Sequence, residues 1–204
     1  MKVAIIHDWL TGMRGGEKCL EVFCELFPQA TIFTLLHNKG SASEIIERMR
    51  IKTSFIHNLP YASTKYRNYL PFFPQAIESF NLEGFDFILS SSHCVAKGAK
   101  KPKNAFHLCY CYTPMRYSWL FFDEYFGNCW IGKKKFIKMV CENLKRWDIA
   151  TLPRVDEFAA ISETVKQRIK DIYQKDARII YPPVDVDRFY LDKGAKKEDY
   201  YLCV

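Results

Sequence analysis

The sequence predicts an α/β protein with a Rossmann-like, doubly wound and mainly parallel sheet. Short apolar runs of strand length recur along the 204 residues, and helical segments separate them. Several runs are apolar at consecutive positions, which is typical of strands that are buried on both faces. Such strands, alternating with helices, indicate a parallel sheet that carries helices on each side.

The expected elements follow from these apolar runs and from the helical periods between them. Strands are expected at residues 2–7, 31–36, 51–56, 85–90, 105–111, 157–161 and 177–181. Helices are expected at residues 16–26, 43–49, 63–80, 131–151 and 163–173. The third helix should break at Pro71 and Pro74, because proline lacks an N–H donor and fixes φ.

The first strand leads into a loop that contains Gly15 and Gly16, and a helical pattern begins at Glu17. Glycine lets the main chain approach a ligand without a Cβ in the way. The first N–H groups of a helix have no internal acceptors, so they can donate to a phosphate. The segment is compatible with phosphate binding, although a plain turn between strand and helix is the commoner explanation of such a segment taken alone.

The composition describes a folded chain with a surplus of positive charge. Hydrophobic residues make up 49% and aromatic residues 16%, which excludes a disordered chain. The net charge of +7 favours anionic partners. The sequence contains no apolar run of the roughly 20 residues that a membrane span needs, and the first run ends at His7, too early for a signal peptide. We therefore expect a soluble, cytoplasmic protein.

The eight cysteines are expected to be reduced thiols. No two of them have C-x-x-C spacing, and most lie in apolar stretches, which suits a cytosolic protein. His107, Cys109 and Cys111 alternate along an expected strand and would share one face, as the start of a zinc site would require. A fourth ligand at a suitable spacing is missing from the sequence. We therefore expect no metal and no other cofactor.

The character of the chain changes after residue 181. Pro182 and Pro183 interrupt regular structure, a charged stretch follows, and a new apolar run begins at Tyr200. We expect a Rossmann-like domain over residues 1–186 and a linker over 187–198. Residues 199–204 would then begin a second domain that is truncated here.

Four strings of residues, in this order, carry a resemblance to a known family. They are the loop at 15–17 (GGE), the segment 90–98 (SSSHCVAKG), the segment 110–119 (YCYTPMRYSW) and the segment 181–189 (YPPVDVDRF). Together they make the chain resemble the N-terminal half of a retaining glycosyltransferase of family 4, which has the two-domain GT-B architecture. The resemblance covers essentially the whole chain.

The resemblance implies a division of labour between two Rossmann-like domains that face each other across a cleft. The N-terminal domain would hold mainly a lipid-linked or polysaccharide acceptor, and the C-terminal domain would hold the nucleotide-sugar. Gly15 and Gly16 would meet the donor diphosphate, and no metal is implied. The residues expected to bind the acceptor are Asp8, Trp9, Ser92, His93 and Tyr117. The isolated half should be inactive, and its open cleft face should favour self-association.

Tyr112 and Arg116 are the candidate catalytic residues. Family members often carry His before the Thr-Pro pair, where this chain has Tyr112, and a phenol is a poor base near neutral pH. Packing against the sheet is the alternative role for Tyr112, and a surface salt bridge is the alternative for Arg116. The family's pair of glutamates belongs to the C-terminal domain. Here Glu17, with the glutamates at 21 and 25, is expected to form a solvated helix face.

One basic and aromatic stretch is expected to contact an anionic membrane surface from the cytoplasmic side. Its members are Lys65, Tyr66, Arg67, Tyr69, Phe72 and Phe73. A second such stretch, residues 133–140, is expected to pack an apolar stripe on the core and expose its lysines. A non-catalytic nucleotide- or nucleic-acid-binding module is the alternative function. We do not expect nucleic acid to be a partner of the transferase.

Overall fold

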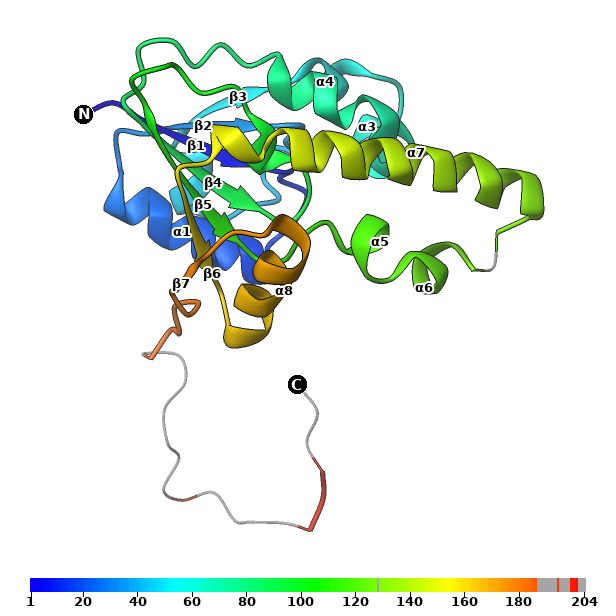
Figure 1. The fold of residues 1–204 in the computed structure, drawn as a ribbon. Helices are drawn as coiled ribbons and strands as arrows, with labels where there is room; N and C mark the ends of the chain where they lie inside the picture. The colour runs from blue at the N-terminus through cyan, green and yellow to red at the C-terminus, as the bar shows by residue number, and fades with distance from the viewer. Residues whose placement is uncertain (128, 187–193, 195–198, 202–204) are drawn as a thin grey trace.

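The computed structural model describes residues 1–127, 129–186, 194 and 199–201. The linker predicted at 187–198 and the second domain predicted from 199 lie mostly outside these residues. Within them, a sheet of seven strands forms the centre of the molecule, and helices cover both of its faces (Figure 1). No helix of the described chain is long and apolar enough to cross a membrane.

The sheet is parallel throughout, with strand order β3-β2-β1-β4-β5-β6-β7. Its strands are β1 (Val3–His7), β2 (Thr31–Thr34), β3 (Arg50–Thr53), β4 (Phe87–Ser92), β5 (Phe106–Cys111), β6 (Glu157–Ala160) and β7 (Arg178–Ile179). The chain first builds outward from β1 through β2 to β3, then returns to the other side of β1 with β4. This reversal is the mark of a doubly wound sheet, so the predicted fold class is confirmed.

The helices are α1 (Gly15–Leu26), α2 (Glu44–Glu47), α3 (Ala62–Lys65), α4 (Phe73–Glu78), α5 (Arg116–Trp119), α6 (Phe122–Phe126), α7 (Ile131–Ala150) and α8 (Glu163–Tyr173). The helix predicted over 63–80 is divided into α3, a 3-10 segment η2 (Tyr66–Phe72) and α4. Pro71 lies inside η2 and Pro74 in the first turn of α4. The predicted helix is therefore interrupted in the region of the expected prolines. The interruption is longer than expected, because the 3-10 segment already begins at Tyr66.

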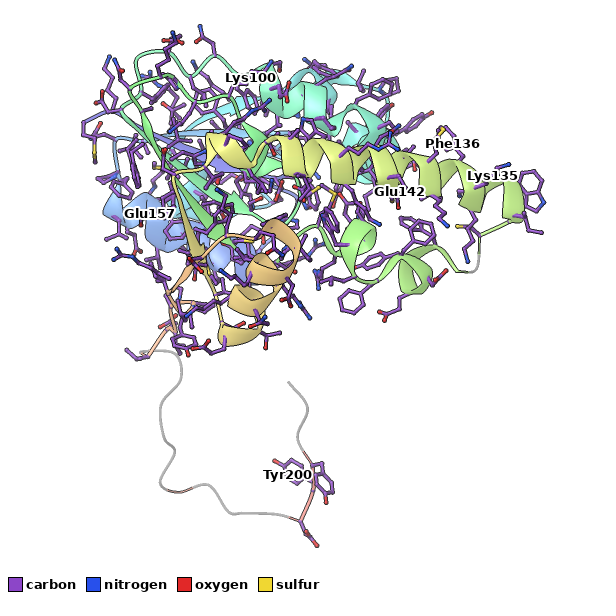
Figure 2. All side chains as sticks on the ribbon, viewed as in Figure 1. Lys100, Lys135, Phe136, Glu142, Glu157 and Tyr200 are labelled. Atoms are coloured by element: carbon purple, nitrogen blue, oxygen red, sulfur yellow. The ribbon has the colours of Figure 1, made fainter. Side chains whose placement is uncertain are left out.

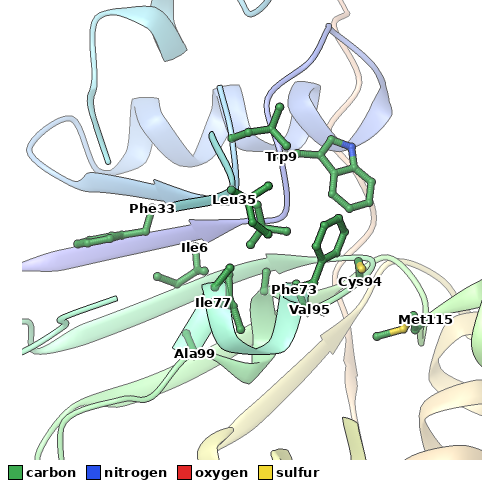
Figure 3. Close-up of a cluster of buried hydrophobic side chains, with 14 of the residues drawn as sticks. Ile6, Trp9, Phe33, Leu35, Phe73, Ile77, Cys94, Val95, Ala99 and Met115 are labelled. Atoms are coloured by element: carbon green, nitrogen blue, oxygen red, sulfur yellow. The ribbon is translucent and has the colours of Figure 1, made fainter. Parts of the chain in front are cut away.

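Alternate side chains of β1 pack into two different cores. Ile6 belongs to a cluster with Phe33, Phe73 and Ile77, on the face covered by α4 and the inner half of α7 (Figure 3). Ile5 points to the opposite face, where its cluster includes residues of α1. Both isoleucines are fully buried. A strand buried on both faces explains why the sequence signal was a continuous apolar run.

The aromatic stretch that was expected to meet a membrane is partly used by the core. Tyr66 is 4% exposed and Phe73 is 1% exposed, and the ring of Tyr66 lies 5.0 Å from that of Trp9, centroid to centroid. The Tyr69 hydroxyl donates to the Pro60 carbonyl at 2.7 Å. Tyr66 and Phe73 therefore cannot reach a bilayer in this fold. The reason is that the gap between the end of β1 and α4 needs large side chains to fill it.

The second basic stretch also differs from the prediction. Val140, Leu144 and other side chains of the inner half of α7 are buried. At the outer half, Phe136 is 56% exposed and Met139 is 54% exposed. This half of α7 runs past the sheet, and α5 and α6 lie beneath it in the view of Figure 1. We call α5, α6 and the outer half of α7 the arm.

A buried ion pair connects the loop after β4 with the inner half of α7. Lys97, in the 3-10 turn η3 (Ala96–Gly98), places its ammonium 2.9 Å from the carboxylate of Asp148 on α7. The ammonium also donates to the Thr151 hydroxyl at 3.0 Å. Trp119 and Tyr173 each donate to the second oxygen of Asp148. Two charges removed from water are thus surrounded by donors and acceptors, as burial of charge requires.

His107, which was weighed as a zinc ligand, is fully buried and hydrogen-bonded to the protein at both ring nitrogens. Its Nδ1 faces the Arg154 carbonyl at 2.8 Å and its Nε2 faces the Ser90 hydroxyl at 2.8 Å. A carbonyl can only accept, so the neutral ring carries its proton on Nδ1 and accepts at Nε2. No cluster of three metal-ligating side chains occurs in the part of the chain that the structure describes.

Burial lowers the pKa of His107 to about 4, despite the Arg154 carbonyl, which favours the charged form. The folded protein therefore binds fewer protons than the unfolded chain between about pH 4 and 6.5. We expect the free energy of unfolding to fall as the pH falls through this range, by up to about 3 kcal/mol. Urea denaturation at a series of pH values measures it. His107→Gln should flatten this dependence, whereas the exposed His57→Gln should not; equal slopes in all three proteins would contradict the prediction.

Candidate functional site

The carboxyl ends of β1, β4 and β5 open into a polar pocket of about 280 Å³. The strand order reverses between β1 and β4, and ligands of doubly wound sheets bind at such a switch point. The residues that line the polar pocket are His7, Trp9, Arg14, Gly16, Glu17, Arg67, His93, Tyr112, Arg116, Tyr117 and Tyr125. The structure therefore brings most of the predicted site residues to one place.

The glycine loop supplies one wall of the polar pocket. Gly15 and Gly16 are the first two residues of α1, and their N–H groups have no acceptor among the residues that the structure describes. A Cβ added at Gly15 would meet nothing within 4 Å, and one at Gly16 would make ordinary contacts of 3.7–3.8 Å with Tyr112 and His7. The fold itself does not demand glycine at either position. The space above Gly15 is open, and Gly16 faces the polar pocket beside Tyr112 and His7.

A chain of hydrogen bonds connects this loop to the end of β1. The Tyr112 hydroxyl donates to the Gly16 carbonyl at 3.0 Å, and it lies 3.0 Å from the Ser91 hydroxyl. Ser91 in turn lies 3.0 Å from His7 Nδ1. Each hydroxyl has one proton, so all three contacts are satisfied only if His7 donates to Ser91 and Ser91 donates to Tyr112. The predicted catalytic tyrosine thus fixes the glycine loop in place.

The direction of this chain leaves His7 Nε2 facing Glu17. Nε2 is buried without a hydrogen-bond partner in the described part of the chain, and it lies 3.7 Å from Glu17 Oε1. Neither residue was predicted to belong to the site. His7 was available from the sequence as a polar residue at a strand end, but Glu17 was concealed by its spacing with the two following glutamates.

The prediction that Glu17 lies on a solvated helix face is wrong. Its side chain is buried because the third residue of α1 turns back toward β1, and its Oε2 accepts the Arg14 backbone N–H at 3.1 Å. Burial by itself raises the pKa of this carboxyl. Its close approach to His7 and its contacts with two backbone N–H groups outweigh burial and hold the pKa below its usual value. Glu17 is therefore a carboxylate at neutral pH.

Asp8 was expected to bind the acceptor, and the structure gives it another role. Its carboxylate is fully buried and accepts four consecutive backbone N–H groups, those of His93, Cys94, Val95 and Ala96, at 2.7–2.9 Å. Ser92 is also buried, and its hydroxyl accepts the backbone N–H of Lys97. Both side chains hold the loop after β4, because a loop buried at this point needs acceptors for its amides.

The other predicted acceptor residues do line the polar pocket. His93 keeps about a quarter of its side chain exposed and places Nδ1 3.1 Å from the Asp8 carboxylate. Burial lowers its pKa, with Asp8 acting in the opposite direction, so the ring is neutral near pH 7. Its edge packs on the Trp9 ring at a centroid distance of 4.5 Å. Tyr117 lines the pocket and its hydroxyl contacts the Cys94 thiol at 2.7 Å.

Three exposed arginines make the polar pocket electropositive. Arg14 precedes α1, Arg67 lies in η2, and Arg116 begins α5. None of the three has an ion-pair partner among residues 1–127 and 129–186. Three guanidinium groups, together with the amides of the glycine loop, are suited to an anion that carries several oxygens, such as a phosphate or diphosphate.

Comparison with known proteins gives a likeness of fold. No protein-family model matches the sequence, and no curated protein matches it. The crystal structure of Anabaena Alr3699/HepE in complex with UDP is similar over 92% of this chain, with a TM-score of 0.50 and 9% sequence identity. The chain has a GT-B-like fold. It spans 45% of the length of HepE.

This likeness does not extend to chemistry. At 9% identity it concerns the fold of the GT-B-like chain alone, and UDP is a ligand of HepE. Membership of family 4 and the position of this chain as the N-terminal half of a longer enzyme stay predictions.

The contacts of Asp8 predict a strong effect of Asp8→Asn on stability. An amide has one oxygen in place of two and turns an NH₂ group toward backbone N–H donors. Hydrogen bonds to a charged group contribute about 1.5–3 kcal/mol each, so we expect the free energy of unfolding to fall by at least about 2 kcal/mol in urea denaturation. Asp171→Asn, on the exposed side of α8, is the matched control. Equal stability of the two variants would show that the four contacts contribute little.

The hydrogen-bond chain predicts what Tyr112→Phe does. Burial raises the pKa of this phenol, so it acts as a donor and not as a base. We expect the variant to lose about 1 kcal/mol of stability and to bind a nucleoside diphosphate more weakly, because the Gly16 carbonyl loses its donor. Affinity should fall by the same factor at pH 6 and pH 8. A loss of activity confined to high pH would instead point to a role as a base.

Proposed function

We propose that this GT-B-like chain is the acceptor-binding half of a retaining glycosyltransferase of family 4. The parent enzyme would transfer a sugar from a nucleotide-sugar to a lipid-linked or polysaccharide acceptor, at the cytoplasmic side of a membrane and without a metal. The observation that carries the proposal is the polar pocket at the switch point of the sheet. There Gly16, the second residue of α1, shares a cavity with Arg14, Arg67 and Arg116.

The chemistry of sugar transfer explains why such a pocket is useful. The leaving nucleoside diphosphate gains negative charge as the bond to the sugar breaks. Donors that are already in place stabilise that charge more in the transition state than in the ground state. In this chain, the amides of α1 would receive the diphosphate, and Arg116 would lie at its side. Tyr112, Ser91 and His7 would keep the glycine loop in position.

Glu17 contributes a negatively charged carboxylate to the polar pocket, and this group would repel a bound anion. Glu17 lines the polar pocket together with His7, whose Nε2 lies 3.7 Å away, so its carboxylate could accept a hydrogen bond from a hydroxyl of a bound sugar. A neutral His93 at the same wall can accept or donate a hydrogen bond. The pocket thus offers cationic groups for a diphosphate and a polar set, Glu17, His7 and His93, for a sugar.

Nucleotide binding by the full-length protein tests the proposal. Calorimetric titration with UDP, GDP and dTDP should show binding of at least one of them. Gly16→Ala should weaken that binding at least fivefold, because its methyl group enters the space above the loop, while helix propensity keeps or raises stability. Thr164→Ala, at the equivalent second position of α8, is the matched control and should change neither.

Two results would contradict the proposal. The first is that none of the three nucleotides binds the full-length protein. The second is that Gly16→Ala binds as tightly as the parent, which would make the glycine loop a plain turn. Binding of any polynucleotide with an affinity that falls steeply with salt would favour the nucleic-acid-binding alternative.

A further inference from the structure

An apolar groove of about 830 Å³ lies beside the polar pocket. One side is formed by η2, with Leu70 and Pro71, and the other by the arm, with Phe126, Phe136 and Ile137. The volume falls within the range of about 300–1,000 Å³ that is usual for ligand sites. Monomeric proteins seldom leave apolar surface of this extent open without a use for it.

The sequence of α7 is arranged to build this groove. Lys133, Ile137 and Val140 are spaced by three and four residues, so one face of the helix lines the groove. Figure 2 shows Phe136 and Lys135 on the outer half of the helix, beyond the sheet. Lys134 forms an ion pair with Asp123 of α6 at 2.8 Å, which connects α6 with α7 within the arm. Lys133 lines the groove and has no ion-pair partner among the described residues.

The groove and the polar pocket are continuous. Trp9, Arg67, Tyr117 and Tyr125 line both of them. A single bound molecule can therefore place an anionic end beside Arg67, where the groove meets the polar pocket, and extend an apolar end along the arm. The aromatic side chains at the junction have one polar and one apolar part, which suits the boundary of an amphiphile.

We propose that the apolar groove holds the hydrocarbon chain of a phosphate-bearing lipid acceptor whose phosphate or diphosphate lies beside Arg67, at the junction with the polar pocket. The inference rests on the proposed function and selects a lipid-linked acceptor over a polysaccharide. A polysaccharide requires a surface of hydrogen-bonding groups, whereas most residues that line the groove are aliphatic or aromatic, and Arg67, Asn68 and Lys133 are its polar members. The cation at the junction, Arg67, matches a lipid phosphate.

The tip of the arm supports the same conclusion. Trp130 and Ile131 are about four-fifths exposed and lie next to Lys133, Lys134 and Lys135. Exposed tryptophan beside lysines is typical of segments that touch a membrane surface. A lipid held in a bilayer would need such a contact in order to pass its chain into the groove. The arm would thus add a membrane-contacting surface to the predicted stretch at 65–73, in which Lys65, Arg67 and Phe72 stay exposed.

Binding of a short lipid diphosphate to the full-length protein tests the inference. The probes are farnesyl diphosphate, inorganic pyrophosphate and farnesol, each followed by calorimetry below the concentration at which farnesyl diphosphate forms micelles. We expect farnesyl diphosphate to bind at least tenfold more tightly than pyrophosphate, because only the former fills both sites. Farnesol, which lacks the anion, should bind more weakly than farnesyl diphosphate.

Two variants of α7 locate the binding site. Ile137→Glu places a carboxylate in the apolar groove and should reduce the affinity for farnesyl diphosphate to that for pyrophosphate, with nucleotide binding unchanged. Lys135→Gln makes the same change of charge on α7 outside the groove and should leave all affinities unchanged. If circular dichroism shows that Ile137→Glu unfolds, Ile137→Trp fills the groove without a charge and gives the same readout.

The inference is overturned if farnesyl diphosphate and pyrophosphate bind equally tightly. It is also overturned if the groove variants leave the affinity for farnesyl diphosphate intact, as they would if another part of the full-length protein covered the groove. Either result can occur with nucleotide binding preserved, and the proposed function then stands with a different acceptor. Loss of nucleotide binding in the parent protein would instead contradict the proposed function.

Discussion

The site depends on a single carboxylate, that of Asp8, which accepts four backbone N–H groups from the loop after β4. Parallel strands leave their carboxyl ends open, and the connections there must satisfy their own amides in the absence of a partner strand. Asp8 supplies the acceptors at the ends of β1 and β4, the two strands between which the strand order reverses. The four amides share its negative charge, so the loop is fixed in the same step as the end of β1.

Consequences of that contact extend outward along the chain. The loop held by Asp8 leads directly into Lys97, which is buried against Asp148 of α7. A buried ion pair contributes little net stability by itself, but removing either partner leaves an uncompensated charge. The pair therefore acts as a constraint on position more than as a source of energy. The pair fixes the position of α7, from which the arm extends, relative to the end of β4. The polar pocket and the apolar groove are therefore held at a fixed position relative to each other.

The sequence was sufficient to predict the sheet because its signal is local. Runs such as Val3–Ile6 are apolar at every position, and their short length between polar segments favours a buried strand over a helix. The glycine loop and the segment that contains Tyr112 were found for the same reason, since strand ends and glycines can be located without knowing what packs on them. Part of the predicted site could therefore be placed from residues alone.

The sequence could not show which of its amphipathic and aromatic segments are buried by tertiary packing. Tyr66 and Phe73 look like a membrane-facing set, and only the gap beside Trp9 makes them core residues. Glu17 has the spacing of a solvated stripe, yet the turn of α1 toward β1 buries it beside His7. In α7 the same amphipathic pattern is buried over one half and exposed over the other. Each outcome depends on residues distant in sequence, which periodicity does not encode.

The hydrogen bonds from His7 through Ser91 and Tyr112 to Gly16 all run in one direction. Every member donates in the same direction, and the last acceptor is the carbonyl of a peptide in the turn whose amides face the polar pocket. Hydrogen bonds in series polarise one another, so the peptide after Gly16 carries a larger dipole than an isolated one. The protein thus raises the positive potential at the start of α1 through hydrogen bonds that begin at the end of β1.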